Sequence, residues 1–361
     1  MPQTQQLTED LRAREFGDTR FHLYESIWRL APNVRTFEDI MDCLADVVIA
    51  IENDTLLPSW ALDLAERLPD GHNLLGVCRS EFINAAHYIE IALVEAQRRN
   101  PPIVHSDQAT ICSKLSVGHG GRLVVGTLNY DDSILAGSTV FYDGFDHKRD
   151  TAPFDDRFSE RVRRQSKALL WLHGCTHFNI NGGTDRLPGI LLGQVFWTGD
   201  ALQAARGWSG AQHNGRLELP LVIGADKPRQ ILRAPFINYW ATLSDFATVV
   251  DRLVVIGYSG GDEHLNRILQ NIVKWRGAEL KVVISTKAAS WDEATPMLAK
   301  VFGSPFEKHG LRICQPATPR HSLQQVLSLP VPTLPKVWVD LDGVEDLAAP
   351  VTLEKLLEIL Q

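Results

Sequence analysis

Apolar residues recur at helical spacing through the first third of the chain. The segment 37–51 reads FEDIMDCLADVVIAI, in which Thr36 is suited to cap the helix and acidic residues occupy the first turn. A second long amphipathic stretch covers 80–99 and stops before two consecutive prolines, which interrupt helices. With a shorter helix expected over 59–68, the pattern predicts a mostly helical region over residues 1–120.

From residue 121 the pattern changes to short apolar runs that end in polar or glycine-rich turns, at 122–128, 168–172, 219–223, 252–256, 280–285 and 311–314. Several runs are continuously apolar, as expected of strands buried on both faces of a parallel sheet. Helical patterns lie between them, at 237–250, 262–275 and 291–302. This alternation predicts an α/β fold over 121–315, with a Rossmann-like, doubly wound, mostly parallel sheet beside the helical N-terminal subdomain.

Two segments depart from this alternation. Residues 143–164 are charged and aromatic, and they predict an exposed loop that leads to a short helix. Residues 316–335 are rich in proline, which is typical of a linker. One strand over 336–341 and one helix over 352–360 are expected after that linker, so residues 316–361 form the third predicted part.

Composition and charge narrow the class of protein. The chain has 361 residues, of which 44% are hydrophobic and 22% charged, and this excludes a disordered or collagen-like chain. Its net charge of −8 argues against direct binding of nucleic acid. The five cysteines form no CxxC pair, which is typical of a reducing compartment. Without a signal peptide or a long apolar run, the sequence predicts a cytoplasmic protein that does not bind membranes.

The first candidate motif follows the run at 122–128. Ligands bind at the carboxyl ends of strands in open α/β sheets, so polar residues at these ends are candidates for chemistry. Here the sequence is TLNYD, with Thr127, Asn129 and Asp131. Alternate residues of an extended segment point to one side, so Asn129 and Asp131 would offer an amide and a carboxylate to a ligand. The same residues also suit a simple turn.

The second motif follows the run at 168–172. His173 would serve as a general base or bind a sugar hydroxyl near neutral pH, with a structural histidine as the alternative. His177 lies four residues further on, a spacing known from zinc sites. Gly174 and the lack of a glutamate between the histidines argue against a metal, so none is predicted. Cys175 is expected to be buried rather than nucleophilic.

The third motif, GYSGGDEH, separates the run at 252–256 from a helix. Gly257 allows a tight turn, and the helix N-terminus would offer backbone N–H groups to an anion beside Ser259 and His264. Asp262 alternatively caps the helix. The letters also fit the G-x-S-x-G nucleophile elbow of α/β-hydrolases.

Taken in this order, TLNYD, LHG and VVIGYSGGDEHLN resemble the sirtuin-like NAD-hydrolase domains of bacterial antiphage defence systems. FEDIMDCL also resembles a helix that those domains carry before the strand with the asparagine. The resemblance spans about residues 36–285. It implies a Rossmann-like sheet with an inserted helical part, NAD as the substrate, and cleavage of the nicotinamide–ribose bond.

The resemblance also implies roles by position. Asn129 would hold the attacking water or the ribose, and His173 would contact the ribose hydroxyls and act as base. Asp131 would hold the nicotinamide end. The full set of implied NAD contacts outside the catalytic pair is Thr127, Asp131, Gly174, Gly257, Ser259, Asp262 and His264.

Two features differ from the wider family. The GAGxS glycine loop that grips the pyrophosphate has no counterpart before residue 120, so we expect either a chain without its natural start or an altered pocket. The four-cysteine zinc module of protein deacylases is also missing, which favours the NAD-hydrolase branch. The resemblance further implies a homo-oligomer and a separate partner, such as a hexameric DNA-translocating ATPase or an Argonaute-like sensor.

Two other functions remain open at this point. One is a non-catalytic sirtuin-like subunit that binds a nucleotide or serves as a scaffold, which the missing glycine loop favours. The other is a serine hydrolase with Ser259 as nucleophile and His309 or His321 as base.

Overall fold

The computed structural model describes residues 4–14, 22–99, 122–130, 132–136, 141–181, 190–191, 193–207, 211–213, 216–224, 227–277, 280–285, 291–302 and 336–340. These residues form a mixed α/β structure with a small parallel sheet. The chain divides into two compact units. The first comprises Met1–Pro102, Gly126–Asp132 and Val140–Trp240, and the second comprises Ile103–Val125, Ser133–Thr139 and Ala241–Gln361.

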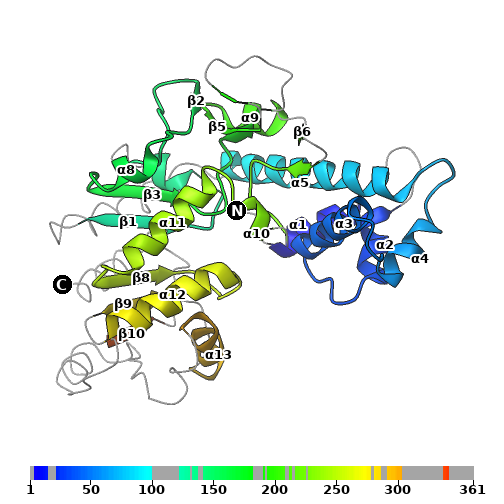
Figure 1. Cartoon of the computed structure of the whole chain (residues 1–361). Coiled ribbons are helices and arrows are strands. Elements are labelled where there is room, and N and C mark those ends of the chain that lie inside the picture. Colours follow the sequence, from blue (N-terminus) through cyan, green and yellow to red (C-terminus); the bar gives the residue numbers. More distant parts are fainter. Residues whose placement is uncertain are drawn as a thin grey trace. The chain divides into compact units, whose positions relative to one another are not determined.

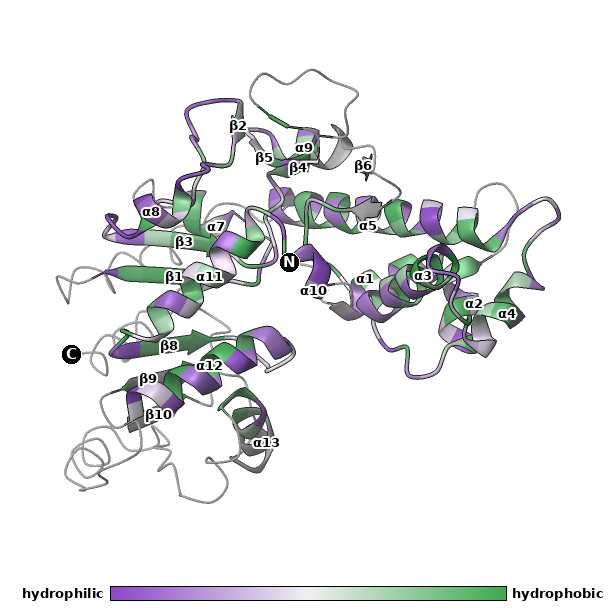
Figure 2. Cartoon of the chain, in the orientation of Figure 1, coloured by the Kyte–Doolittle hydropathy of each residue, from purple (hydrophilic) through white to green (hydrophobic). Residues whose placement is uncertain are grey.

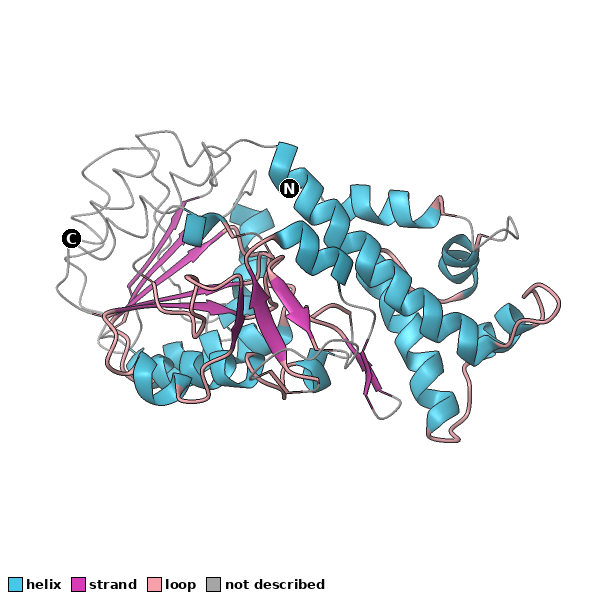
Figure 3. Cartoon of the chain, turned by 90° about the horizontal axis from the view of Figure 1, so that it is seen from above, coloured by secondary structure: helices cyan, strands magenta, loops and turns pink. Residues whose placement is uncertain are grey.

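The N-terminal part of the first unit is a group of helices packed on one another (Figures 1 and 3). They are α1 (Thr4–Arg12), α2 (Leu23–Leu30), α3 (Phe37–Glu52), α4 (Ser59–Ala65) and α5 (Leu74–Arg99). Their apolar faces share one core that includes Ile27, Ile40, Leu44, Phe82 and Ile89. The predicted helices at 37–51 and 59–68 are confirmed, and the helix predicted at 80–99 begins earlier, at Leu74.

The start of α3 is fixed by a capping box, as its sequence predicts. Thr36 Oγ1 accepts a hydrogen bond from Asp39 N at 3.2 Å, and the Asp39 carboxylate accepts one from Thr36 N at 2.8 Å. Two backbone N–H groups that the helix leaves unpaired are thereby satisfied.

The described strands before β8 form a two-stranded pair, a three-stranded sheet and a hairpin. Strand β1 (Leu123–Thr127) pairs with β3 (Lys167–Trp171), which confirms the predicted strands at 122–128 and 168–172. A second, antiparallel sheet has the order β2 (Thr151–Pro153), β5 (Val195–Thr198), β4 (Phe178–Ile180). Strands β6 (Ala211–His213) and β7 (Arg216–Glu218) form the hairpin. Strands of three or four residues carry too short a pattern for sequence periodicity to detect.

Short helices connect these strands. They are α7 (Ser133–Ala136), α8 (Phe158–Val162), α9 (Ala201–Gly207) and α10 (Lys227–Gln230), and the longer α11 (Phe236–Ala247) follows. Helix α11 confirms the pattern at 237–250.

The strand predicted at 219–223 is wrong. This segment has no strand partner, although its apolar side chains are buried, Leu221 and Ile223 among them. Both backbone groups of Ile223 bond the side-chain amide of Gln230, each at 2.9 Å, in place of a neighbouring strand. Because the segment packs into the core of the N-terminal helices, its continuous apolar pattern reflects burial and not a sheet.

The prediction of an exposed loop at 143–164 that leads to a short helix is confirmed in part: its charged residues are mostly exposed and the helix is α8, while its aromatic residues are buried. Phe145, Phe154 and Phe158 are buried and pack edge-on or tilted against one another with ring centroids 5.2–5.3 Å apart. The buried Asp143 carboxylate accepts hydrogen bonds from Trp171 Nε1 at 3.0 Å and from Phe145 N at 3.2 Å. The charged residues of this segment lie in the sequence on either side of the buried Phe145, Phe154 and Phe158.

The second unit contains the parallel sheet. Strands β8 (Arg252–Ile256), β9 (Lys281–Ser285) and β10 (Lys336–Asp340) pair in the order β10-β9-β8. Helix α12 (Glu263–Arg276) links β8 to β9, and α13 (Trp291–Phe302) follows. Figure 2 shows the largely hydrophobic β8 beside α12, which carries both hydrophobic and hydrophilic residues. These elements confirm the patterns at 252–256, 262–275, 280–285, 291–302 and 336–341.

The described core of this unit includes Val255, Leu269, Ile272, Val282 and Leu298. The predicted elements at 311–314 and 352–360 and the proline-rich segment 316–335 lie outside the described residues. Among the helices that are described, none combines the length and the apolar composition required to cross a membrane.

Candidate functional site

The loops after β1 and β3 lie against each other, which brings the first two predicted motifs together. Leu172 N donates to Thr127 O at 3.0 Å, and Thr176 N donates to Tyr130 O at 2.8 Å. The Tyr130 hydroxyl then donates to Val222 O at 3.0 Å, in the buried segment before α10. Residues 127–130 are therefore held by two backbone hydrogen bonds on one side and by the Tyr130 hydroxyl on another.

Asn129 lies in this loop with an exposed side chain. Its backbone N donates to Thr127 Oγ1 at 3.0 Å, which is a local turn closed by the threonine hydroxyl. The Thr127 hydroxyl therefore shapes the loop. The backbone of this segment forms a turn, as the alternative interpretation of the sequence predicted. The amide of Asn129 remains on the surface of the loop, while Asp131 lies outside the described residues.

His173 follows β3 and is buried, with 6% of its surface exposed. Its ring lies 6.3 Å from Tyr130 and 6.5 Å from Trp240, measured between ring centroids. Its carbonyl accepts a hydrogen bond from Val222 N at 2.8 Å, which ties the loop to the segment before α10. The imidazole therefore sits in an aromatic environment that restricts water.

Gly174 is required by the backbone next to His173. Its φ is +96°, in the region that favours glycine, and a Cβ added there would lie 2.9 Å from Leu221 Cδ2 and 3.2 Å from Pro220 O. The close approach of these two segments leaves no room for a side chain. The glycine that the sequence singled out as a ligand contact thus has a structural role in the turn.

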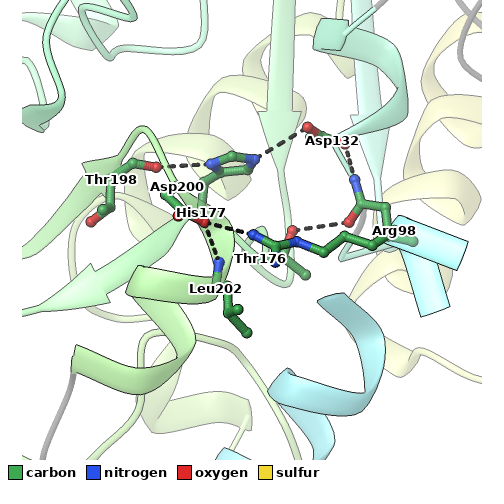
Figure 4. A network of polar contacts seen from close by, with 8 residues as sticks. Arg98, Asp132, Thr176, His177, Thr198, Asp200 and Leu202 are labelled. Carbon is green, nitrogen blue, oxygen red and sulfur yellow. Dashed lines mark hydrogen bonds and ion pairs between the residues drawn. The ribbon is translucent and has the colours of Figure 1, made fainter. Parts of the chain in front are cut away.

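Sequence reasoning missed a polar network that surrounds these two loops (Figure 4). His177 Nε2 lies 3.2 Å from Asp132 Oδ2, and its Nδ1 lies 2.8 Å from Thr198 O. Asp132 also accepts a hydrogen bond from Gln97 Nε2, on the last turn of α5. The available signals were the position of Asp132 directly after TLNYD and the repeat of a histidine four residues after His173.

An exposed ion pair borders this network. Arg98 Nη2 lies 3.0 Å from Asp200 Oδ1, at the start of α9. Leu202 N donates a hydrogen bond to Asp200 Oδ1 at 2.9 Å, and this bond lowers the pKa of the Asp200 carboxyl. The positive charge of Arg98 lowers the same pKa by a smaller amount. Because both side chains are more than half exposed, this pair contributes little to stability.

The third motif lies in the second unit and forms the turn between β8 and α12. Asp262 caps α12, with its Oδ1 accepting from Leu265 N at 2.9 Å, which confirms the capping alternative. Tyr258 Oη accepts from Asp262 N at 3.0 Å and lies 2.7 Å from Asn266 Oδ1, so it joins the turn to the first helical turn. Burial raises the pKa of the Tyr258 phenol, which keeps it a neutral donor.

Two glycines give this turn its conformation. Gly257 has φ +64° with open space where a Cβ would stand, so a ligand could approach its backbone. Gly260 has φ +76°, and a Cβ added to it would lie 3.0 Å from Val301 Cγ2. Gly257 and Ser259 are exposed, and His264 is half-buried. The motif therefore presents both an exposed backbone and an exposed hydroxyl.

The described residues contain no group of three or more His, Cys, Asp or Glu side chains arranged to hold a metal ion. Both nitrogens of His177 have oxygen partners, so the histidine pair does not form the zinc-type site that its spacing suggested. Cys175 is fully buried, as predicted. Comparison of the sequence with protein-family models and with curated proteins finds no match.

Proposed function

We propose that this chain is an NAD hydrolase that cleaves the bond between nicotinamide and ribose. The observation that carries the proposal is the contact between the loops after β1 and β3, which holds Asn129 and His173 on neighbouring segments. The order of the three motifs, and their resemblance to sirtuin-like domains of antiphage defence, supports the choice of NAD as substrate.

The chemistry follows from these two side chains. In the reaction, a water oxygen bonds to the ribose C1′ while the C1′–N bond to nicotinamide breaks. Nicotinamide leaves with the bonding electron pair, and the products are ADP-ribose, nicotinamide and one proton. Positive charge builds on the sugar as the bond breaks, as in glycoside hydrolysis. The Asn129 amide would orient the water or the ribose, and His173 would accept the proton of the attacking water.

By the resemblance, the turn after β8 is a candidate nucleotide contact within the second unit. Gly257 offers open space beside its backbone, and Ser259 offers an exposed hydroxyl, as a phosphate or ribose contact requires. The β8–α12–β9 unit, with its parallel pairing, supports the finer proposal of a Rossmann-like, doubly wound sheet. In the first unit, Thr127 and Gly174 shape the loops that carry Asn129 and His173. In the second unit, Asp262 caps α12 beside the candidate nucleotide contact, and the half-buried His264 follows it.

The test is release of nicotinamide from NAD by the purified chain, with and without cell extract from phage-infected bacteria. We expect the substitutions Asn129→Ala and His173→Ala to abolish release, since each removes a group required in the transition state. His72→Ala, which changes an exposed histidine between α4 and α5, is the matched control and should leave release unchanged. Equal loss in all three variants, or no release under any condition, contradicts the proposal.

We also propose that the chain acts in the bacterial cytoplasm as the effector of an antiphage defence complex. By resemblance it would form a homo-oligomer and receive its trigger from a partner, such as a hexameric DNA-translocating ATPase or an Argonaute-like sensor. The acidic net charge of −8 supports a partner as the component that senses nucleic acid. Elution at monomer mass, without any co-purifying partner from the native host, would weigh against this assembly.

A second candidate function is a non-catalytic subunit that binds a nucleotide. The burial of His173 favours it, because a base that is 6% exposed must still reach the substrate. Calorimetry with NAD and ADP-ribose separates the two functions, since binding of both ligands without turnover supports the non-catalytic subunit.

The structure favours a serine hydrolase less. A nucleophile elbow strains the serine itself, whereas the positive φ values of this turn belong to Gly257 and Gly260. Labelling of Ser259 by a fluorophosphonate probe would favour the serine hydrolase over the other two functions. His309 and His321, its predicted bases, lie outside the described residues.

A further inference from the structure

One glutamine of α5 touches both loops of the proposed active site. Gln97 Nε2 donates to Asp132 Oδ1, and Gln97 Oε1 accepts from Thr176 Oγ1 at 3.3 Å. The chemistry fixes this orientation of the amide, because a carboxylate only accepts hydrogen bonds and the NH₂ group must therefore face Asp132. Asp132 lies three residues after Asn129, and Thr176 lies three residues after His173.

A second bond joins the same two loops directly. His177 Nε2 lies 3.2 Å from Asp132 Oδ2, so each carboxylate oxygen has its own partner. The imidazole lies flat on the indole of Trp197, with ring centroids 4.4 Å apart and an interplanar angle of 6°. Its Nδ1 faces Thr198 O at 2.8 Å, so the ring donates to both oxygens at once only in its doubly protonated form. Stacking on Trp197 and a polar contact at each ring nitrogen leave the ring little freedom.

Burial makes these contacts stronger than surface pairs. The side chain of Asp132 is 21% exposed and that of His177 is 12% exposed. The two partners of the Asp132 carboxylate, Gln97 and His177, are both polar. Hydrogen bonds to a carboxylate at such a site are stronger than those between neutral groups, since less water competes.

We propose that Gln97, Asp132, Thr176 and His177 form a loop clamp that fixes the Asn129 loop against the His173 loop, with α5 as its anchor. These four are positioning residues, because none of them is required to touch the substrate. The part of the proposal that concerns turnover rests on the proposed NAD hydrolysis. Helix α5 also packs in the core of the N-terminal helices through Phe82 and Ile89, so a partner that shifts α5 would move both loops.

Hydrogen exchange of the full chain without substrate tests the clamp independently of any activity. Gln97→Ala should speed amide exchange about tenfold over residues 123–136 and 172–181, which corresponds to the loss of one charge-assisted hydrogen bond. Arg98→Gln is the matched control on the same helical turn, because it removes only the exposed pair with Asp200 and should leave this exchange unchanged. Equal exchange in Gln97→Ala and in the wild type overturns the clamp.

Turnover of NAD then tests what the clamp does. We expect Gln97→Ala to lower kcat about tenfold with KM changed less than about twofold, because misplaced catalytic loops affect the transition state more than binding. A rise in KM at constant kcat would overturn the positioning role. Arg98→Gln should keep both constants.

The substitution Gln97→Glu adds a pH-dependent readout. Below the pKa of the introduced carboxyl, its O–H donates to Asp132 and turnover is restored; above it, two carboxylates repel each other and turnover falls. The titratable and charged groups around this position are Asp132, His177, Arg98 and Asp200, all present in the wild type. The ratio of variant to wild-type kcat should therefore fall as pH rises from about 5.5 to about 8. A constant ratio overturns the clamp.

The two proposals fail separately. If the wild type releases no nicotinamide but Gln97→Ala exchanges faster in both loops, the clamp stands and NAD hydrolysis is rejected. If the wild type hydrolyses NAD and Gln97→Ala changes neither exchange nor kcat, the clamp is rejected and the hydrolase stands.

Discussion

A partly buried carboxylate on α3, that of Asp42, makes the stability of the helical core depend on pH. The pKa of Asp42 is raised to about 7 from its ordinary value of 3.8, mainly by burial and also by the neighbouring Glu38, Asp39 and Asp46, while Lys227 acts in the opposite direction. A Cβ added at Gly224 would lie 2.5 Å from Asp42 Oδ1, so that loop covers the carboxyl directly. Replacing Asp42 by the isosteric, uncharged Asn isolates this effect.

The sign of the effect follows from the raised pKa. Below pH 3.8 Asp42 is neutral in both states, and its contribution to stability is complete. As pH rises towards about 7, the unfolded chain ionises first and the wild type loses stability, until the folded state also ionises. The difference between about 7 and 3.8 corresponds to about 4 kcal/mol, which solvent at this partly exposed position reduces to about 2 kcal/mol.

The assay is urea unfolding followed by far-UV circular dichroism, at pH values from about 4 to about 8.5, for the wild type and Asp42→Asn. We expect the two proteins to be equally stable at the acidic end, and the variant to gain about 2 kcal/mol relative to the wild type by pH 8. Asp63→Asn, at an exposed position of α4, is the matched control and should give a constant difference. A constant difference for Asp42→Asn, or one that shrinks as pH rises, refutes the reasoning.

Three further changes have expected results. Gly174→Ala should lower the unfolding free energy by about 2–3 kcal/mol, since it adds a side chain at φ +96° against Leu221, and an unchanged melting temperature would contradict the geometry. Thr36→Ala removes the cap of α3 and should cost about 1 kcal/mol in urea unfolding, unlike the conservative Thr36→Ser. Tyr258→Phe should speed hydrogen exchange at the start of α12 about tenfold, because it removes the bonds of the hydroxyl to Asp262 N and Asn266 Oδ1; unaltered exchange would contradict this role of the hydroxyl.

Local patterns in the sequence were sufficient for most regular elements of the fold. The capped start of α3 at Thr36, the boundaries of β8 and α13, and the Asp262 cap of α12 each follow from residues within one or two turns of one another. Such features are determined locally, because side-chain caps and the period of apolar residues act over three to four positions.

The sequence predictions were inaccurate where residues are apolar because they are buried, and not because they belong to a regular helix or strand. The segment 219–223 is apolar because it lies in the core of the N-terminal helices, and its hydrogen bonds to Gln230 could not be read from the sequence. In segment 143–164 the charged residues are mostly exposed, as predicted, but Phe145 and its aromatic neighbours are buried near Asp143, which the charges did not indicate. The doubly wound sheet and the NAD chemistry remain predictions.

For the candidate site, the sequence by itself determined which polar residues end β1, β3 and β8, since strand ends and glycine turns leave local signals. Only the tertiary structure decided that the loops of Asn129 and His173 touch, and that Gln97 bridges Asp132 and Thr176. Gln97 lies 35 residues from Asp132 along the chain. Contacts over such separations depend on how α5 packs against the two loops, and no pattern of neighbouring residues encodes that packing.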